Sequence, residues 1–156
     1  MDNKAEEEFK IWLDKNNIPY WYIDQSLESF SPALRRFWSK RPDFMILIPN
    51  VGFIFVDVKD KSAAEKYPKF FIDADDVDKY SSMQSIFNIK TWIVISNKNY
   101  HYQTWFWMPV SGITKSGFIN KSSVSGEDYY SVPSEEFVTV SPSDNLERIF
   151  SKLLKL

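Results

Sequence analysis

Apolar residues follow two different periods along the chain, and the change of period separates predicted helices from predicted strands. Residues 5–15 and 73–88 repeat apolar positions at the three-to-four spacing typical of amphipathic helices. Residues 44–48 and 53–56 are apolar without a polar break, which predicts strands that are buried on both faces. Residues 91–96 form a further buried strand, and the helix before it favours a parallel pairing with the strand at 53–58.

The remaining segments give weaker patterns that complete the expected order of elements. Residues 18–23 predict a first strand, and Ser31-Pro32 predicts the start of a short helix over residues 33–38. Residues 101–110 predict an outer strand and residues 135–140 a short edge strand. Residues 60–69 and 111–131 are expected to be loops, and residues 146–156 are expected to form a C-terminal amphipathic helix.

The two central runs are joined by Pro-Asn-Val-Gly, which predicts a β-hairpin. A loop of residues 50–52, with Gly52 at positive φ, would pair Pro49 with Phe53. The same register would place Asp43 opposite Lys59, at the open end of the hairpin. The charged residues of this segment stand only at that end, so the hairpin presents its polar chemistry there.

Three of these charged side chains are expected to converge. Cross-strand partners share a face, as do residues two apart on a strand, so Asp43, Asp57 and Lys59 would project the same way. Asp57 directly follows a buried run, where a carboxylate needs a partner. The alternative interpretation is that Asp43 and Lys59 are polar strand ends and that Asp57 is a solvated charge.

Pro42-Asp43 and Asp57-Val58-Lys59 resemble the signature of the PD-(D/E)XK nuclease superfamily, which includes enzymes similar to Holliday junction resolvases and restriction endonucleases. The resemblance implies one α/β domain over residues 1–156, with a three-layer αβββαβ core and a mixed central sheet. It also implies a Mg²⁺ or Mn²⁺ ion held by Asp43, Asp57 and the main-chain carbonyl of Val58. Lys59 would then orient the attacking water or stabilise charge on the phosphorus.

The resemblance to the superfamily also implies a glutamate on the helix that precedes the hairpin. Glu6 lies beside Phe9 and Leu13 at the edge of the apolar stripe, Glu8 lies at its other edge, and Glu7 points away. Archaeal-type Holliday junction resolvases look similar here, because a glutamate is followed at +3 and +7 by apolar residues. This selects Glu6 as the catalytic candidate and leaves Glu8 as the alternative. All three could instead be ordinary first-turn acids that the helix dipole favours.

The expected activity is metal-dependent hydrolysis of phosphodiester bonds in nucleic acid, most often DNA, in phage or prokaryotic DNA processing. A net charge of −2 argues against a general nucleic-acid coat, because phosphate binding needs clustered lysine and arginine. This charge keeps open an alternative, a catalytically inactive nuclease-fold module that binds nucleic acid or another protein. Gln84, on the later helix, is a further site candidate. The residues expected to contact phosphates are Arg35, Arg36, Lys40, Arg41 and Lys61.

The chain has no cysteine, which excludes disulfides and thiolate metal sites and predicts a cytoplasmic protein with oxygen metal ligands. Its acidic first residues and the absence of an apolar run of about 20 residues predict no membrane association. Surplus apolar residues favour a homodimer through residues 100–107, Tyr129-Tyr130 or the C-terminal Leu153, Leu154 and Leu156. The alternative is that these residues complete the core of the monomer.

Overall fold

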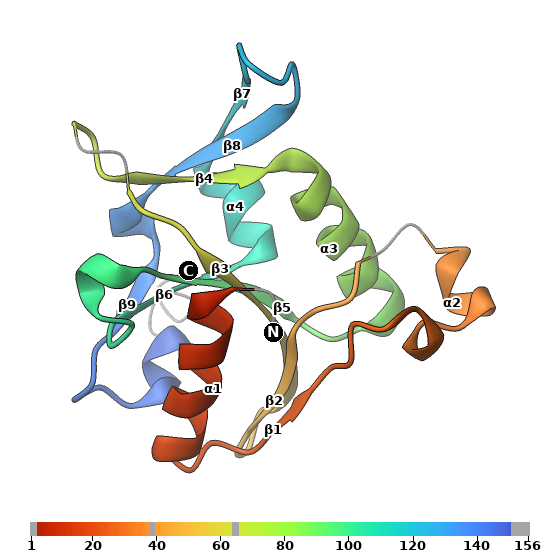
Figure 1. The fold of residues 1–156 in the computed structure, drawn as a ribbon, viewed down its shortest axis with the longest axis vertical. Coiled ribbons are helices and arrows are strands. Elements are labelled where there is room, and N and C mark those ends of the chain that lie inside the picture. The colour runs from red at the N-terminus through yellow and green to blue at the C-terminus, as the bar shows by residue number, and fades with distance from the viewer. Residues whose placement is uncertain (1–2, 38–39, 64–65, 151–156) are drawn as a thin grey trace.

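The structure is a computed structural model, and it describes residues 3–37, 40–63 and 66–150. Within these residues, six strands form a mixed central sheet in the order β1-β2-β3-β5-β6-β9 (Figure 1). β3 and β5 are parallel, and the other neighbouring strands are antiparallel. The strands of this sheet are β1 (Tyr20–Tyr22), β2 (Phe44–Ile48), β3 (Gly52–Asp60), β5 (Thr91–Ser96), β6 (Trp105–Pro109) and β9 (Val138–Val140).

A smaller antiparallel sheet in the order β4-β8-β7 lies at the top of Figure 1. Together with α3 and α4 it covers one face of the central sheet, and α1 covers the other face. The central elements follow the predicted αβββαβ order, with α2 and β4 inserted. The additional elements are α1 (Lys4–Lys15), α2 (Pro32–Arg35), α3 (Ala74–Phe87), α4 (Val110–Ser116), β4 (Lys69–Asp73), β7 (Phe118–Lys121) and β8 (Asp128–Pro133).

The core beneath α1 is aromatic. Phe9 is fully buried, and its ring lies 5.3 Å from Phe44, 4.9 Å from Trp105 and 5.7 Å from Trp107, measured between centroids. α1 begins at a defined point because the side chain of Asn3 accepts a hydrogen bond from the backbone N–H of Glu6 at 2.7 Å. The first helix is therefore fixed both by its cap and by the rings that its apolar stripe contacts.

The core on the opposite face is built between β5, β6, α3, α4 and the small sheet. Val77 and Met83 of α3 are buried there, as are Ile93 of β5 and Phe70 of β4. Asn88 ends α3 in the left-handed conformation (φ 54°), which asparagine tolerates better than most residues. Packing of α3 on this face places its first turns beside the carboxyl end of β3.

The β2–β3 hairpin closes one residue earlier than the sequence predicts. The backbone N–H of Val51 donates to the carbonyl of Ile48 at 3.0 Å, and Asn50 takes a positive φ of 67°. Ile48 consequently pairs with Gly52, which has the expected positive φ, at 108°. Proline followed by asparagine suits this turn, because asparagine tolerates the positive φ that it requires.

The expected pairing of Pro49 with Phe53 and of Asp43 with Lys59 is therefore wrong. Phe44 pairs with Val56, two residues earlier on β3 than the predicted register requires. Asp43 lies just before β2, and its backbone N–H donates to the carbonyl of Val56 at 2.9 Å. Because side chains alternate with a period of two, a shift of two residues leaves the predicted face of each strand residue unchanged.

The structure contains strands that the sequence did not predict. Residues 69–73, between the predicted loop and the predicted helix, form β4, in which Phe70 and Ile72 are buried while their neighbours are not. Residues 111–131, expected to be a loop, contain most of α4, all of β7 and the start of β8. These strands are short, and β7 is exposed throughout, so the sequence carries little alternation to reveal them. They pair with one another rather than with the central sheet.

Three predicted boundaries also change. The strand expected over residues 101–110 begins at Trp105, because the residues before it form turns, and β9 rather than β6 is the edge strand. The helix expected over residues 33–38 spans Pro32–Arg35, and its predicted end at Trp38 lies outside the described residues. At the C-terminus, Leu146–Phe150 form a 3₁₀ helix, and residues 151–156 lie outside the described part.

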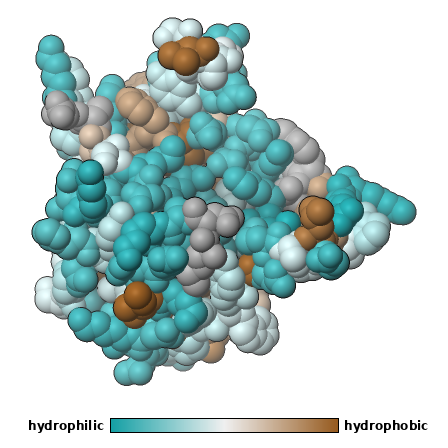
Figure 2. All heavy atoms as spheres, in the orientation of Figure 1, coloured by the Kyte–Doolittle hydropathy of each residue, from teal (hydrophilic) through white to brown (hydrophobic). Residues whose placement is uncertain are grey.

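The aromatic residues of β6 complete the core of the monomer. Trp105 and Trp107 are fully buried, so of the interface segment predicted over residues 100–107 these two side chains belong to the core, whereas Tyr100 is exposed. Figure 2 shows separate apolar patches on a largely hydrophilic face. The predicted contribution of Leu153, Leu154 and Leu156 lies outside the described residues. In the described part of the chain, the helices are too short or too polar to cross a membrane.

Candidate active site

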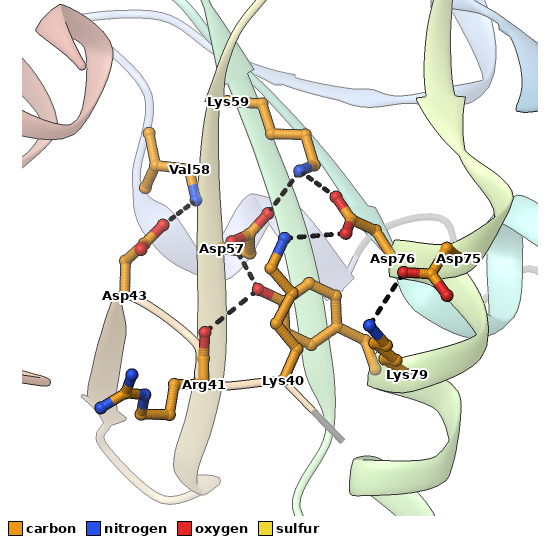
Figure 3. Close-up of polar contacts among 10 residues, drawn as sticks. Lys40, Arg41, Asp43, Asp57, Val58, Lys59, Asp75, Asp76 and Lys79 are labelled. Atoms are coloured by element: carbon orange, nitrogen blue, oxygen red, sulfur yellow. Dashed lines mark hydrogen bonds and ion pairs between the residues drawn. The ribbon is translucent and has the colours of Figure 1, made fainter. Parts of the chain in front are cut away.

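Asp43 stands where the regular pairing of β2 with β3 ends. The backbone N–H of Phe55 donates to Lys90 and that of Lys61 to Ser96, so odd-numbered residues of β3 turn their backbone groups toward β5. Even-numbered residues turn theirs toward β2. Val58 therefore directs its backbone toward the end of β2, where its N–H donates to Asp43 Oδ2 at 2.7 Å (Figure 3).

Asp57 lies on β3 with its side chain nearly enclosed, at 6% exposure. The hydroxyl of Tyr80 lies 2.6 Å from Asp57 Oδ1 and 3.2 Å from the carbonyl oxygen of Arg41, and its one hydrogen can be donated to either. Lys59 Nζ lies 3.0 Å from Asp57 Oδ2. The angle is poor for a hydrogen bond, so within the described residues this buried oxygen has a neighbouring charge but no aligned donor.

Lys59 is held between two carboxylates. Its Nζ donates to Asp76 Oδ2 at 2.8 Å, in addition to the ion pair with Asp57. Lys40 donates to the other oxygen of the same residue, Asp76 Oδ1, at 2.7 Å (Figure 3). Asp76 thus bridges two ammonium groups, one from the segment before β2 and one from β3.

Burial and charge set the protonation of this cluster. Burial, followed by the charge of Asp57, raises the pKa of Asp43 from 3.8 to about 8. Burial alone would lower the pKa of Lys59, but the charges of Asp57 and Asp76 outweigh it and raise that pKa. Burial opposes ionisation of Asp76 as well, yet attraction to Lys59 and the hydrogen bond from Lys40 leave its pKa lowered. Burial and the charge of Asp57 raise the pKa of Tyr80 well above its usual value.

Glu6, which the resemblance selects over Glu8, is the buried glutamate of α1. It is 3% exposed, and its Oε1 accepts a hydrogen bond from the hydroxyl of Tyr22 at 2.9 Å. It lies close enough to Asp43 for its charge to help raise the pKa of that carboxyl. Glu8 instead makes a 2.7 Å ion pair with Lys4 near the surface of α1. Between the two candidates, the geometry therefore favours Glu6.

The five basic candidates have different environments. Arg35 donates to the carbonyls of Phe30 and Leu27, and Arg41 donates to the carbonyl of Ser26 and to the hydroxyl of Ser29, so both hold together the loop before β2. Arg36 is exposed, whereas Lys40 binds Asp76 inside the site. Lys61 is half-buried, and burial together with the charge of Lys59 lowers its pKa.

Gln84 performs a structural task rather than facing the charged cluster. Its side-chain oxygen accepts a hydrogen bond from the backbone N–H of Thr91 at 2.9 Å. Thr91 is the first residue of β5. The contact therefore joins α3 to the beginning of β5. Thr91 pairs with Phe55 of β3, whereas the charged residues of β3 begin at Asp57.

The comparisons with known proteins rest on structure alone. No protein-family model matches the sequence, and no curated protein is significantly similar to it. Hjc from Archaeoglobus fulgidus, a Holliday junction resolvase from an archaeal hyperthermophile, has a similar solved structure, with a TM-score of 0.53. The likeness covers 88% of this chain and 96% of that chain at 12% identity. The chain therefore shares the α/β fold of that protein. The segments Pro42-Asp43 and Asp57-Val58-Lys59 lie at the end of the central hairpin of this fold, where Asp43, Asp57 and Lys59 meet.

α3 adds to the cluster of Asp43, Asp57 and Lys59 two residues that sequence reasoning missed. Asp76 contacts Lys59 and Lys40, and Tyr80 contacts Asp57. The two are four residues apart, so they lie on one face of the helix. The sequence offered a signal in this spacing, but aspartates at a helix start and a tyrosine in an apolar stripe have ordinary explanations.

The oxygen donors of this cluster fit a hard divalent cation. Asp43 and Asp57 supply carboxylates, and Asp57 Oδ2 lacks an aligned donor among the described residues. The carbonyl of Val58 lies on the same edge of β3 as the N–H that binds Asp43. In the described residues, however, no three acidic or histidine side chains gather closely enough to form a cage. Two carboxylates with remaining positions for water or phosphate suit Mg²⁺, which keeps several waters.

Proposed function

We propose that this protein is a divalent-metal-dependent nuclease that hydrolyses phosphodiester bonds, with DNA as its substrate. The observation that supports the proposal is the convergence of Asp43, Asp57 and Lys59 at the end of the central hairpin. This cluster occurs in a fold similar to that of Hjc, a Holliday junction resolvase. Two buried carboxylates beside a lysine match the chemistry of metal-assisted phosphodiester hydrolysis.

Asp43, Asp57 and the carbonyl of Val58 would hold Mg²⁺ or Mn²⁺. A bound divalent cation supplies Lewis acidity, which makes its water acidic enough to yield hydroxide near neutral pH. The negative charge of Asp57 contributes, after burial, to the raised pKa of Asp43. A bound cation would offset the negative charge that the two carboxylates bring together. Glu6 would act from the side of α1, through its charge on this site or through a water.

Lys59 has the position of a group that acts on the substrate phosphate. Its side chain is 14% exposed, and its raised pKa keeps it protonated at neutral pH. A fixed ammonium can orient the attacking water or stabilise charge that develops on the phosphorus. Arg36 and Lys61 would contact phosphates of the nucleic-acid backbone away from the cleaved bond. Such contacts position a nucleic acid but do not specify its sequence.

Cutting both strands of a duplex or junction requires two such sites related by a two-fold axis, and we therefore retain the homodimer as a proposal. Among the described residues, the exposed apolar side chains include Trp21, which stacks on Phe53 with ring centroids 5.5 Å apart. Light scattering well above micromolar concentration is expected to report a dimer. A monomer would restrict the activity to nicking or flap cleavage.

Metal-dependent cleavage by matched variants tests the proposed activity. Purified protein is incubated with plasmid, single-stranded DNA, four-way branched DNA or RNA, in Mg²⁺, Mn²⁺ or EDTA. Asp57→Asn is expected to lower cleavage by at least about 10³-fold, because it removes a charged ligand and activation of the water. The control Asp60→Asn changes an exposed aspartate of the same strand, whose side chain accepts from Tyr102 at 2.9 Å, and is expected to cut normally.

Metal binding gives a readout that does not depend on cutting. Millimolar Mg²⁺ or Mn²⁺ is expected to raise the melting temperature of the wild type, and Asp57→Asn is expected to lose that shift. Absence of both the shift and cleavage would favour the inactive nucleic-acid-binding or protein-interaction module. Full cleavage by folded Asp57→Asn would remove the proposed site.

A further inference from the structure

We propose that Asp76 is a positioning residue that fixes Lys59 in the site, and that Lys40 is a cation that leaves Asp76 to bind a substrate phosphate. The inference rests on the proposed nuclease function and extends it to residues outside the PD-(D/E)XK signature. Its basis is the bridge in which one carboxylate of α3 binds two ammonium groups, at 2.7 Å and 2.8 Å (Figure 3).

The two lysines differ in how firmly the protein holds them. Lys59 contacts both Asp57 and Asp76, and its side chain is 14% exposed. Lys40 contacts Asp76, and its side chain is 43% exposed. Its Nζ also lies 5.8 Å from the centroid of the Tyr80 ring. An incoming phosphate can therefore compete for Lys40 from solvent, whereas Lys59 is shielded and has a second carboxylate.

Asp76 has the burial and the connections needed to hold Lys59. Its side chain is 13% exposed, and both of its oxygens are engaged by ammonium groups. α3 supports this geometry a second time one turn later, where Tyr80 contacts Asp57. The rigid helix thus fixes the carboxylate and the ammonium of β3 from the same side.

When Lys40 moves to the phosphate, its ion pair with Asp76 is broken, and no covalent bond is formed or broken. Asp76 then keeps Lys59 as its partner, and the released oxygen of Asp76 faces the position that Lys40 has left. The phosphate gains a charge-assisted hydrogen bond from Lys40. Asp76 consequently competes with the substrate for one lysine while it positions the other, so its removal should affect binding and turnover in opposite directions.

The experiment compares Asp76→Asn with Asp75→Asn, which makes the same change one residue earlier. Asp75 is 60% exposed and pairs with Lys79 at 2.9 Å, away from the site (Figure 3). Asp76→Asn is expected to lower kcat by about 10²-fold, the loss that a misplacement of about 1 Å causes. It is also expected to tighten the binding of a fluorescent branched DNA in EDTA, because Lys40 is released. Asp75→Asn is expected to change neither quantity.

Two further variants separate positioning from a merely structural contribution. Lys40→Gln is expected to raise KM severalfold while kcat stays within about twofold, and to lower the salt slope of DNA binding by about 0.9. Lys79→Gln is its surface control and is expected to keep the wild-type KM. Asp76→Glu, which restores the charge, is expected to recover part of kcat. Circular dichroism and melting curves establish that each variant is folded.

The outcomes distinguish this inference from the proposed function. If the wild type neither cuts nor binds DNA, the proposed nuclease function fails. If the wild type cuts, but Asp76→Asn weakens binding or keeps kcat within about twofold, the positioning role of Asp76 is overturned. An unchanged salt slope in Lys40→Gln would overturn the phosphate role of Lys40 while leaving the nuclease function intact. Lys40 is partly exposed, so that variant also decides the question if Asp76→Asn does not fold.

Discussion

The two faces of the central sheet are filled by different chemistry. Beneath α1, Phe9, Trp105 and Trp107 form a buried aromatic cluster. On the face of α3, apolar packing gives way at the end of β3 to a network in which Asp57 and Asp76 surround Lys59. The first face is filled mainly by apolar rings, whereas the second keeps charged groups that compensate one another.

The difference shows how one strand serves both stability and chemistry. Val56 and Val58 of β3 point toward the α1 face and are buried, while Asp57 and Lys59 alternate with them toward the α3 face. Regular pairing with β2 ends beside these polar residues. The site therefore lies where backbone pairing stops but the core still fixes the strand.

The largest predicted effect on stability belongs to the α1 face. Phe9→Ala is expected to lower the free energy of unfolding by about 3–5 kcal/mol, because it removes a buried ring that contacts four others. Urea denaturation measures the change. Ile11→Ala on the same helix is the control, because Ile11 is 57% exposed and should change stability by less than about 0.5 kcal/mol.

An equal loss in both variants would contradict the contrast between the buried and the exposed side of α1. Folded Phe9→Ala protein should retain the polar contacts of the opposite face, because the ring does not reach them. Its metal-induced rise in melting temperature is therefore expected to persist. Loss of that rise in a folded variant would show that the two faces are coupled.

The sequence was informative about the face of each strand residue. Alternation placed Asp43, Asp57 and Lys59 together even though the register of the hairpin was wrong, because a shift of two residues does not change the face. Helical spacing left Glu6 and Glu8 at the two edges of the apolar stripe of α1, and the resemblance to archaeal-type resolvases selected Glu6, which is the buried one. Local periodicity was sufficient for the strand faces but not for this choice.

Contacts between distant segments could not be read in this way. Asp76 meets Lys40 across 36 positions of sequence and Lys59 across 17. Periodicity gives the face of a helix, but it does not give the height at which that helix packs on a strand. The small sheet was missed for a related reason, since β7 is exposed and pairs with a strand that follows a loop.

The pH dependence of stability tests the charged face, and its expected effect is smaller than that of Phe9→Ala. The pKa of Asp43 rises from 3.8 to about 8 on folding, so between these values the folded state holds a proton that the unfolded state has released. The contribution of Asp43 to the free energy of unfolding is greatest below about pH 4 and decreases as the pH rises toward 8. The loss should reach at most about 2 kcal/mol between pH 6.0 and 7.5, measured by urea denaturation in EDTA.

Asp43→Asn isolates this contribution, because asparagine does not titrate. The variant is expected to show a shallower fall of stability with pH than the wild type. Mg²⁺ should reverse the trend in the wild type, since a metal binds the deprotonated carboxylate more tightly as the pH rises. Parallel pH profiles of the wild type and Asp43→Asn in EDTA would reject the raised pKa.

The smallest predicted effect comes from a single hydroxyl that links α3 to β3. Tyr80→Phe leaves Asp57 Oδ1 without its 2.6 Å donor and is expected to cost about 1 kcal/mol in urea denaturation. Tyr102→Phe is the matched control, because its hydroxyl makes a similar 2.9 Å contact with Asp60 at the surface, where water can replace it. Tyr80→Phe should also weaken Mg²⁺ binding, because an unanchored Asp57 must be ordered when the ion binds. Equal stability losses in the two variants, with unchanged Mg²⁺ affinity in Tyr80→Phe, would mean that α3 supports the fold without orienting Asp57.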